Sequence, residues 1–395
     1  MNATMKRITS LIRKNMMLSL SVMAAACSLL ITPPSAKLFK SIDWRTLANL
    51  AMMLSVLQGF KKENIFAPIV TACCRLKSVT AIAFAMVFGV FFSSMFVTND
   101  VSLIIFVPLT ISIYRSLGKE NLILPTITME NIAAVRGSLL APFGSPQNLF
   151  LFGKSNISAL EFIKGMAPLC AISAALLAIF IFVLLRRKTK EPCESAEHAD
   201  SSEVAHESIT YESDRFRWKK TSYAILLAIA IASITSRTTY WPYVLAFILI
   251  SVLILDKRNL MEVDWSLLAV FLCFFVFSSS IAGNKTLASF LGKSVAGNEY
   301  WWSIALSQIV SNVPAAIILH PFSYNMARLI YGLDSAGLVS IIGSLASVIN
   351  YRLYVREFPG NGKAFLKAFT LISLAFFAVV AIPGYLLSAK DFLAK

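Results

Sequence analysis

Long apolar segments separated by short polar stretches run through almost the whole chain. A segment of about 17–25 apolar residues is long enough to cross a lipid bilayer as a helix. The apolar segments lie at 16–31, 43–60, 79–115, 123–152, 162–186, 222–236, 239–256, 264–282, 300–328, 335–350 and 366–388. This pattern predicts an all-α polytopic membrane protein, with about nine full spans if two of the segments fold back as hairpins.

Two of the apolar segments are interrupted by a hydroxyl residue followed by Asn. The first interruption is Thr98-Asn99 within FVTNDVSLIIFVPL, and the second is Ser311-Asn312 within QIVSNVPAAIILHPF. Inside hydrocarbon, polar backbone is tolerated only where protein buries it or where it lines a cavity. We therefore expect each interruption to be the tip of a re-entrant hairpin.

The two halves of the chain share three landmarks in the same order: an Asp-Trp pair opening a span, the hydroxyl–Asn pair and a Gly-Ser pair. They read IDWRTLANL, TN and GSLLAPFGSPQNLFLF in the first half, and VDWSLLAVF, SN and AGLVSIIGSLASVIN in the second. Three landmarks in register indicate a duplication. We expect two inverted repeats, 1–186 and 221–395, joined by a polar cytoplasmic linker at 187–220. Each repeat has a broken helix and a re-entrant hairpin, the first at 79–115 facing the cytoplasm and the second at 300–328 facing outward.

Charged residues are few and lie mainly at the ends of the apolar segments. The chain is 57% hydrophobic and 14% charged, with a formal net charge of +15. The Lys and Arg residues form short clusters next to spans, as the positive-inside rule expects. They do not form a basic stripe with interleaved aromatics, which argues against a nucleic-acid partner. This distribution predicts a multi-pass protein of the cell (inner or plasma) membrane with the N-terminus in the cytoplasm and the C-terminus outside.

The first apolar segment, 16–31, has two interpretations. Basic residues before it and Ala24-Ala25-Ala26-Cys27 within it are typical of a cleaved signal peptide. A retained first span is favoured, because its removal would leave the two halves unequal. The six cysteines have no C-x-x-C spacing, so neither a zinc site nor a disulfide framework is indicated.

The interrupted segments carry side chains suited to binding ions. Asn offers a donor and an acceptor without a net charge to bury, and a helix that ends in mid-membrane leaves backbone groups free for an anion or a cation. At the first Gly-Ser break, Gly144 and Pro146 interrupt the helix while Gln147 and Asn148 bring amides. The structural alternatives are an Asn bonded within a bundle and a plain Pro kink.

Four ionisable residues are expected at membrane depth, where such groups are usually functional: Asp100, Glu130, Arg136 and His320. Asp100 is the best candidate for a cation-coupling carboxylate, the alternative being a carboxylate that stabilises the start of a helix. Arg136 either holds an anionic substrate or neutralises Glu130 or Asp100, and we favour the pairing. His320 is expected to be structural.

The segments FVTNDVSLIIFVPL, FGSPQNLFLF and SNVPAAIIL resemble the citrate-transporter-like permeases of the ion transporter superfamily. That group includes divalent anion–sodium symporters, arsenite permeases and certain sodium–proton antiporters. The resemblance covers nearly the whole chain, and it implies a homodimer in which a transport domain moves like an elevator against a scaffold. The tips Thr98-Asn99-Asp100 and Ser311-Asn312-Val313 depart from the Ser-Asn-Thr of the dicarboxylate symporters. The break around Pro146 is closer to the arsenite-permease branch.

The resemblance also implies a set of site residues. Substrate-binding residues would be Thr98, Asn99, Arg136, Gln147, Asn148, Ser311, Asn312 and Val313. Cation-coupling residues would be Asn99, Asp100, Ser138, Gly144, Ser145, Asn312, Gly343 and Ser344. Sodium is the metal ion that this set suggests, and no cofactor is expected beyond Na⁺ or H⁺ as the coupling ion. Asp43 and Asp264, which open the two Asp-Trp spans, are expected to be helix N-caps.

These observations predict a secondary active transporter, not an enzyme. It would carry a small anion, such as the di- or tricarboxylate citrate, across the membrane with Na⁺ or H⁺. The alternatives are arsenite or antimonite efflux and Na⁺/H⁺ exchange. No intramembrane protease motif, repeated carbonyl filter or phosphate-binding loop is visible, which argues against an enzyme, a channel and direct ATP drive. A separate ATPase partner stays open.

Overall fold

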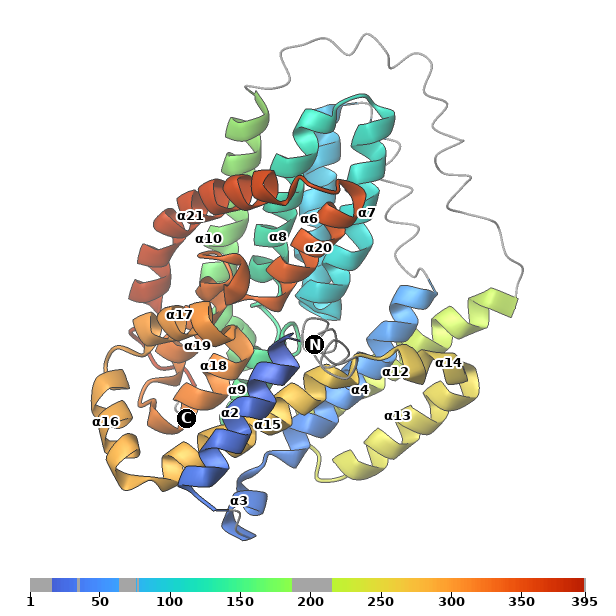
Figure 1. Cartoon of the computed structure of the whole chain (residues 1–395). Coiled ribbons are helices and arrows are strands. Elements are labelled where there is room, and N and C mark those ends of the chain that lie inside the picture. Colours follow the sequence, from blue (N-terminus) through green and yellow to red (C-terminus); the bar gives the residue numbers. More distant parts are fainter. Residues whose placement is uncertain (1–15, 34–35, 64–75, 77, 187–214, 394–395) are drawn as a thin grey trace, which may run out of the picture.

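The computed structural model describes residues 16–33, 36–63, 76, 78–186 and 215–393, and all regular secondary structure in these residues is helical (Figure 1). The first half contains α2 (Met16–Ile31), α3 (Ala36–Ser41), α4 (Trp44–Lys62), α6 (Val79–Val97), α7 (Asn99–Ser116), α8 (Ile123–Gly137), α9 (Pro146–Lys154) and α10 (Ala159–Arg186). The second contains α12 (Arg215–Ser236), α13 (Trp241–Leu255), α14 (Lys257–Glu262), α15 (Trp265–Gly283), α16 (Lys285–Val295), α17 (Glu299–Val310), α18 (Asn312–Leu319), α19 (Met326–Ala336), α20 (Leu345–Glu357) and α21 (Gly362–Leu387).

Four of the described helices are long and apolar enough to cross a membrane. They are α6, α10 over Ala159–Leu184, α15 and α21, while α2, α13 and α18 contain shorter apolar stretches. The prediction of an all-α polytopic membrane protein agrees with this architecture. The count of about nine spans and the inverted repeats stay predictions.

The two hydroxyl–Asn interruptions are sharp helix breaks. Thr98 separates α6 from α7, and Ser311 separates α17 from α18. The two residues share a backbone conformation that non-glycine residues rarely adopt, with φ 75° and ψ 153° at Thr98 and φ 72° and ψ 160° at Ser311. Helices α6 and α7 lie side by side, and so do α17 and α18 (Figure 1). Each interruption is therefore the turn of a helical hairpin.

The two Gly-Ser segments are non-α-helical breaks between half-helices. The first break separates α8 from α9, and the second separates α19 from α20. A Cβ on Gly144 would lie 2.2 Å from the carbonyl oxygen of Ser138, and one on Gly343 would lie 2.2 Å from that of Ala336. No side chain fits at that separation, so both breaks require glycine where the chain folds back on its preceding helix end.

The broken helices are joined crosswise by hydrogen bonds. Asn131 of α8 donates to the Ser347 hydroxyl of α20 at 3.0 Å, and Gln147 of α9 donates to Asp334 of α19, also at 3.0 Å. The half-helix before each break thus contacts the half-helix after the other break. This arrangement brings the two breaks, which lie some two hundred residues apart in the chain, into one region of the fold.

Some helix bounds differ from those expected. The amphipathic helix α16 was not anticipated, because its 11 residues are too short and too polar to be recognised as a span. Helix α19 begins at Met326, inside the segment expected to end the second hairpin. Of the expected linker 187–220, residues 187–214 lie outside the described residues and 215–220 belong to α12. The N-terminal basic cluster and Cys73, Cys74 and Cys193 also lie outside the described residues.

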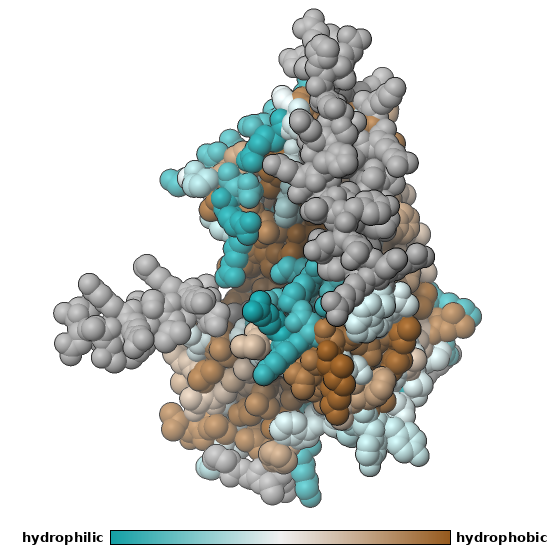
Figure 2. Space-filling view, turned by 90° about the vertical axis from the view of Figure 1, so that its right-hand side faces the viewer, coloured by the Kyte–Doolittle hydropathy of each residue, from teal (hydrophilic) through white to brown (hydrophobic). Residues whose placement is uncertain are grey.

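The helices pack together in three groups. Helix α2 packs along α15, and α4 packs against α12 and α13; α6, α8, α10 and α21 pack together above them in Figure 1. Apolar side chains cover much of the lower part of the face in Figure 2, with a hydrophilic band across its middle. Such an apolar exterior fits contact with lipid.

Candidate functional site

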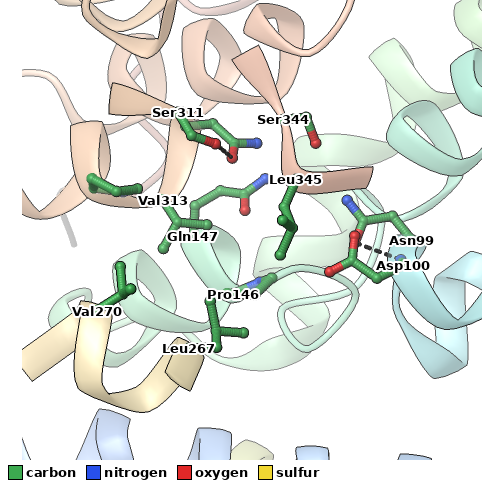
Figure 3. A pocket seen from close by; sticks show the side chains of 12 residues that line it. Asn99, Asp100, Pro146, Gln147, Leu267, Val270, Ser311, Val313, Ser344 and Leu345 are labelled. Atoms are coloured by element: carbon green, nitrogen blue, oxygen red, sulfur yellow. Dashed lines mark hydrogen bonds between the residues drawn. The ribbon is translucent and has the colours of Figure 1, made fainter. Parts of the chain in front are cut away.

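The starts of four helices meet at one narrow hollow, which we call the central hollow (Figure 3). Two of them, α7 and α18, follow the hairpin turns, and the other two, α9 and α20, follow the breaks. Its lining residues are Asn99, Asp100, Pro146, Gln147, Leu267, Val270, Ser311, Asn312, Val313, Pro314, Ser344 and Leu345. The two interruptions and the two breaks identified in the sequence are thus brought together.

Helix starts favour anions because their first N–H groups have no partner within the helix and their dipoles end there. The N-cap residues of α7, α18 and α20, which are Thr98, Ser311 and Ser344, make no side-chain capping bond, whereas the hydroxyl of Ser145 accepts a hydrogen bond from the N–H of Asn148 in α9. Among the residues that the structure describes, no Lys, Arg or His lines the central hollow. Any attraction for an anion therefore comes from the backbone and from neutral side chains.

Of the described residues that line the central hollow, Asp100 is the one with a charged side chain. Its Oδ1 atom is buried and has no hydrogen-bond partner among the described residues. The neighbouring Asn99 uses its Oδ1 atom to accept from the Asp100 N–H at 2.9 Å. The carboxylate therefore has a free oxygen with which to bind a cation or a proton, since carboxylate oxygens are hard ligands.

Gln147 lies in the middle of the ring of side chains in Figure 3, between Ser311 and Leu345. It is 2% exposed, and its Nε2 atom donates to Oδ1 of Asp334 at 3.0 Å. Its own Oε1 atom is buried without a partner among the described residues. Gln147 thus brings an unpaired acceptor to the central hollow.

Arg136 does not line the central hollow. Its guanidinium is fully buried and donates to the Ser173 hydroxyl at 3.0 Å and to the backbone carbonyl of Asp334 at 3.1 Å. Within the described residues it forms no ion pair with Glu130 or Asp100, so the pairing favoured from the sequence is wrong. The Nη2 atom of the same guanidinium is buried and has no hydrogen-bond partner among the described residues.

Two wider hollows adjoin the central one. The second is shared by α4, α7 and α9 and includes Asp100, Thr98 and Ser145 among its lining residues. The third lies between α2, α15, α17 and α20 and includes Ser311 and Arg352. Both share lining residues with the central hollow, among them Leu267 and Leu345.

The other site residues expected from the sequence lie near the two breaks, outside the lining of the central hollow. Ser138, Ser145 and Asn148 are buried next to the first break. Gly144 and Gly343 shape the breaks through the close approaches described above. These five residues do not line the central hollow, although Ser145 lines the second one.

Glu130 and His320 also lie away from the hollows. Glu130 is fully buried and accepts a hydrogen bond from Thr110. His320 packs edge-on against Phe150, with ring centroids 5.4 Å apart. Neither residue lines any of the three hollows.

Asp334 is the one buried acid at the site that the sequence analysis did not select. It is 1% exposed and lies in LIYGLDSAG, which reads as an ordinary amphipathic helix with one polar residue. A signal did exist, since an acid within a span is usually functional. It was not selected because residues 329–334 lay between the expected hairpin, 300–328, and the expected interrupted segment, 335–350.

Comparison with known proteins shows which family the chain belongs to. The profile of a family described as a citrate transporter, CitMHS, matches residues 8–343. The chain belongs to the CitMHS family. It is 28% identical over 354 residues to the inner membrane protein YbiR of Escherichia coli K12, covering 88% of each chain. It is 29% identical over 345 residues to an uncharacterized transporter of Methanocaldococcus jannaschii, covering 85% of this chain and 86% of the other. Membership of the CitMHS family makes the chain a membrane transporter and not an enzyme.

Proposed function

We propose that the chain is a secondary active transporter that carries a small carboxylate anion of the citrate class together with Na⁺ or H⁺. The observation that carries the proposal is the meeting of four helix starts at a hollow with one acidic side chain and no basic one. The helix starts suit an anion, and the carboxylate suits a cation.

The anion would lie toward the helix starts of α18 and α20. Ser311, Asn312 and Ser344 bring hydroxyl and amide donors there, and no acidic residue belongs to those first turns. Val313 lines the same part of the central hollow with an apolar side chain. A carboxylate placed there would accept hydrogen bonds from several neutral donors, as anions do at helix N-termini.

The cation would lie toward Asp100, at the start of α7. A cation there neutralises the carboxylate that would otherwise repel an incoming anion. Cation and anion binding would therefore favour each other, and this mutual preference is the physical basis of coupled transport.

The wider architecture belongs to the same proposal. The matching backbone at Thr98 and Ser311, the matching close approaches at Gly144 and Gly343 and the crosswise bonds of the breaks support two inverted repeats. We expect one unit with the hairpins and broken helices to move like an elevator against a scaffold that includes α4, α12 and α13. A homodimer with the N-terminus in the cytoplasm completes the proposal.

The test combines ligand binding with flux. Purified protein is heated with sodium, at several pH values, and with citrate, succinate, malate, sulfate, phosphate and arsenite, because a ligand of the folded state raises its melting temperature. We expect a cation-dependent shift with a carboxylate that is lost in Asn99→Ala and Asn312→Ala. The matched control is Thr126→Val, which removes a buried hydroxyl that lines none of the hollows. Absence of carboxylate-dependent flux in proteoliposomes under every sodium and proton gradient would refute the proposal.

Na⁺/H⁺ exchange is the second candidate, and the unpaired oxygen of Asp100 is what favours it. In that case sodium or pH alone would shift the melting temperature. The shift would vanish in Asp100→Asn, and every anion would be without effect. Flux of arsenite under the same conditions would support the efflux alternative instead.

A further inference from the structure

We propose that Asp334 fixes the orientation of the Gln147 amide, so that the site prefers carboxylates that carry a hydroxyl group over keto acids and unsubstituted analogues. This inference rests on the proposed function and names a chemical feature of its substrate.

The first step is the hydrogen bond across the breaks. Asp334, near the end of α19, is buried, and its Oδ1 atom accepts from Nε2 of Gln147 at 3.0 Å. The Asn148 amide also reaches this carboxylate when its nitrogen faces acceptors, at 3.1 Å from Oδ1 and 3.3 Å from Oδ2. One buried carboxylate therefore accepts from two adjacent amides in the first turn of α9.

The second step is the polarity of that bond. An ionised carboxylate can only accept hydrogen bonds, whereas a Gln amide has a nitrogen that donates and an oxygen that accepts. The nitrogen of Gln147 faces Asp334 in this bond, and its oxygen is turned away from the carboxylate. Arg136 supports this arrangement by holding the Asp334 backbone carbonyl at 3.1 Å.

The third step is what the oxygen meets. Oε1 of Gln147 is buried and has no partner among the described residues, although its side chain lies in the middle of the central hollow (Figure 3). Buried polar atoms in folded proteins nearly always have a partner. Under this proposal the partner is a group of the ligand, and a group that hydrogen-bonds an amide oxygen has to be a donor.

A carboxylate anion offers only acceptors through its carboxyl groups, so the donor has to be another substituent. A hydroxyl group is the smallest one that fits, and citrate and malate each carry one. A site built to bond a substrate hydroxyl discriminates against an analogue without it, because the analogue leaves the acceptor unpaired. A keto group fails for the same reason, since it can only accept.

The experiment compares ligands that differ in this one group. Citrate is compared with tricarballylate, which lacks the hydroxyl, and malate is compared with succinate and oxaloacetate, by thermal shift and by competition in flux. We expect the hydroxy acid to bind at least about tenfold more tightly in each comparison. Equal affinity for citrate and tricarballylate would overturn the inference and leave the proposed function standing. Binding of none of these anions would overturn both.

Two variants separate orientation from mere stability. Gln147→Met keeps the length of the side chain without the acceptor, and we expect the citrate-to-tricarballylate ratio to fall toward one. Asp334→Asn allows the amide to invert and present its nitrogen, so the malate-to-oxaloacetate ratio is expected to fall by about tenfold or to reverse. Thr126→Val is the control, with both ratios expected to stay as in the wild type. Unchanged ratios in Gln147→Met would overturn the inference even if Asp334→Asn fails to fold.

Discussion

Arg237 ties the end of α9 to the turn between α12 and α13, and its removal gives a quantitative test of this packing. Its Nη1 atom donates to the carbonyl of Ser155 at 2.5 Å, and its Nη2 atom donates to the carbonyl of Phe152 at 2.9 Å and to the Ser155 hydroxyl at 3.2 Å. The guanidinium also lies 4.4 Å from the ring centroid of Phe152. A cation at this place is stabilised by the helix C-terminus.

The magnitude follows from these contacts. A hydrogen bond to a charged group contributes about 1.5–3 kcal/mol, and a cation–π contact contributes about 0.5–1 kcal/mol. Ordering the Arg side chain costs about 2 kcal/mol, and water replaces part of the lost bonds because the residue is half-buried. We therefore expect Arg237→Ala to lower the free energy of unfolding by about 2–3 kcal/mol.

A second variant isolates the backbone contribution. Arg237 has φ 50°, in the region that favours glycine. Arg237→Gly removes the same contacts and also relieves this strain, so it should be less destabilising than Arg237→Ala by about 1 kcal/mol. Unfolding in mixed micelles, followed by tryptophan fluorescence, measures both differences. A free energy for Arg237→Ala within about 0.5 kcal/mol of the wild type would refute the reasoning, because surface substitutions without contacts lie in that range.

Three further predictions concern other contacts. Gly144→Ala should abolish folding or binding, because its Cβ would meet a backbone carbonyl at 2.2 Å, and the expression level of folded protein measures this. A double-mutant cycle of Asn131→Ala and Ser347→Ala should give a coupling of about 0.5–1.5 kcal/mol, and strict additivity would contradict the bond between them. Lys62, 2.5 Å from Asp256, lowers the pKa of that carboxyl. This ion pair therefore stabilises the fold at pH values above the pKa of Asp256 in the unfolded chain, and its contribution is lost as the pH falls. The difference in the free energy of unfolding between wild type and Lys62→Met should accordingly shrink below about pH 4.

Local rules recovered much of the fold from the sequence. Asp43 accepts from the Thr46 N–H at 3.0 Å and Asp264 accepts from the Ser266 N–H at 3.2 Å, so both are the N-caps that were expected. The expected segment 16–31 coincides with α2. Caps and apolar lengths depend on neighbouring residues, and a sequence contains that information directly.

Contacts between distant segments were harder to predict. The bond between Gln147 and Asp334 joins residues 187 positions apart, and nothing local to either residue indicates it. The turns at Thr98 and Ser311 have positive φ although neither residue is glycine, which no propensity would suggest. Strain of this kind collects at functional sites, where the surrounding fold holds the backbone in place.

The lack of a basic side chain in the central hollow has a consequence for turnover. A fixed Arg or Lys would hold an anion equally strongly on both sides of the membrane and would slow its departure. Here the favourable field comes from helix ends, and under the proposed coupling it is completed by a cation that itself leaves. If the cation binds Asp100 as proposed, its dissociation would leave the carboxylate charged and repelling the remaining anion. Dissociation of the cation would thus set the residence time of the anion, and release of the anion would be fastest on the side of the membrane where the cation is most dilute.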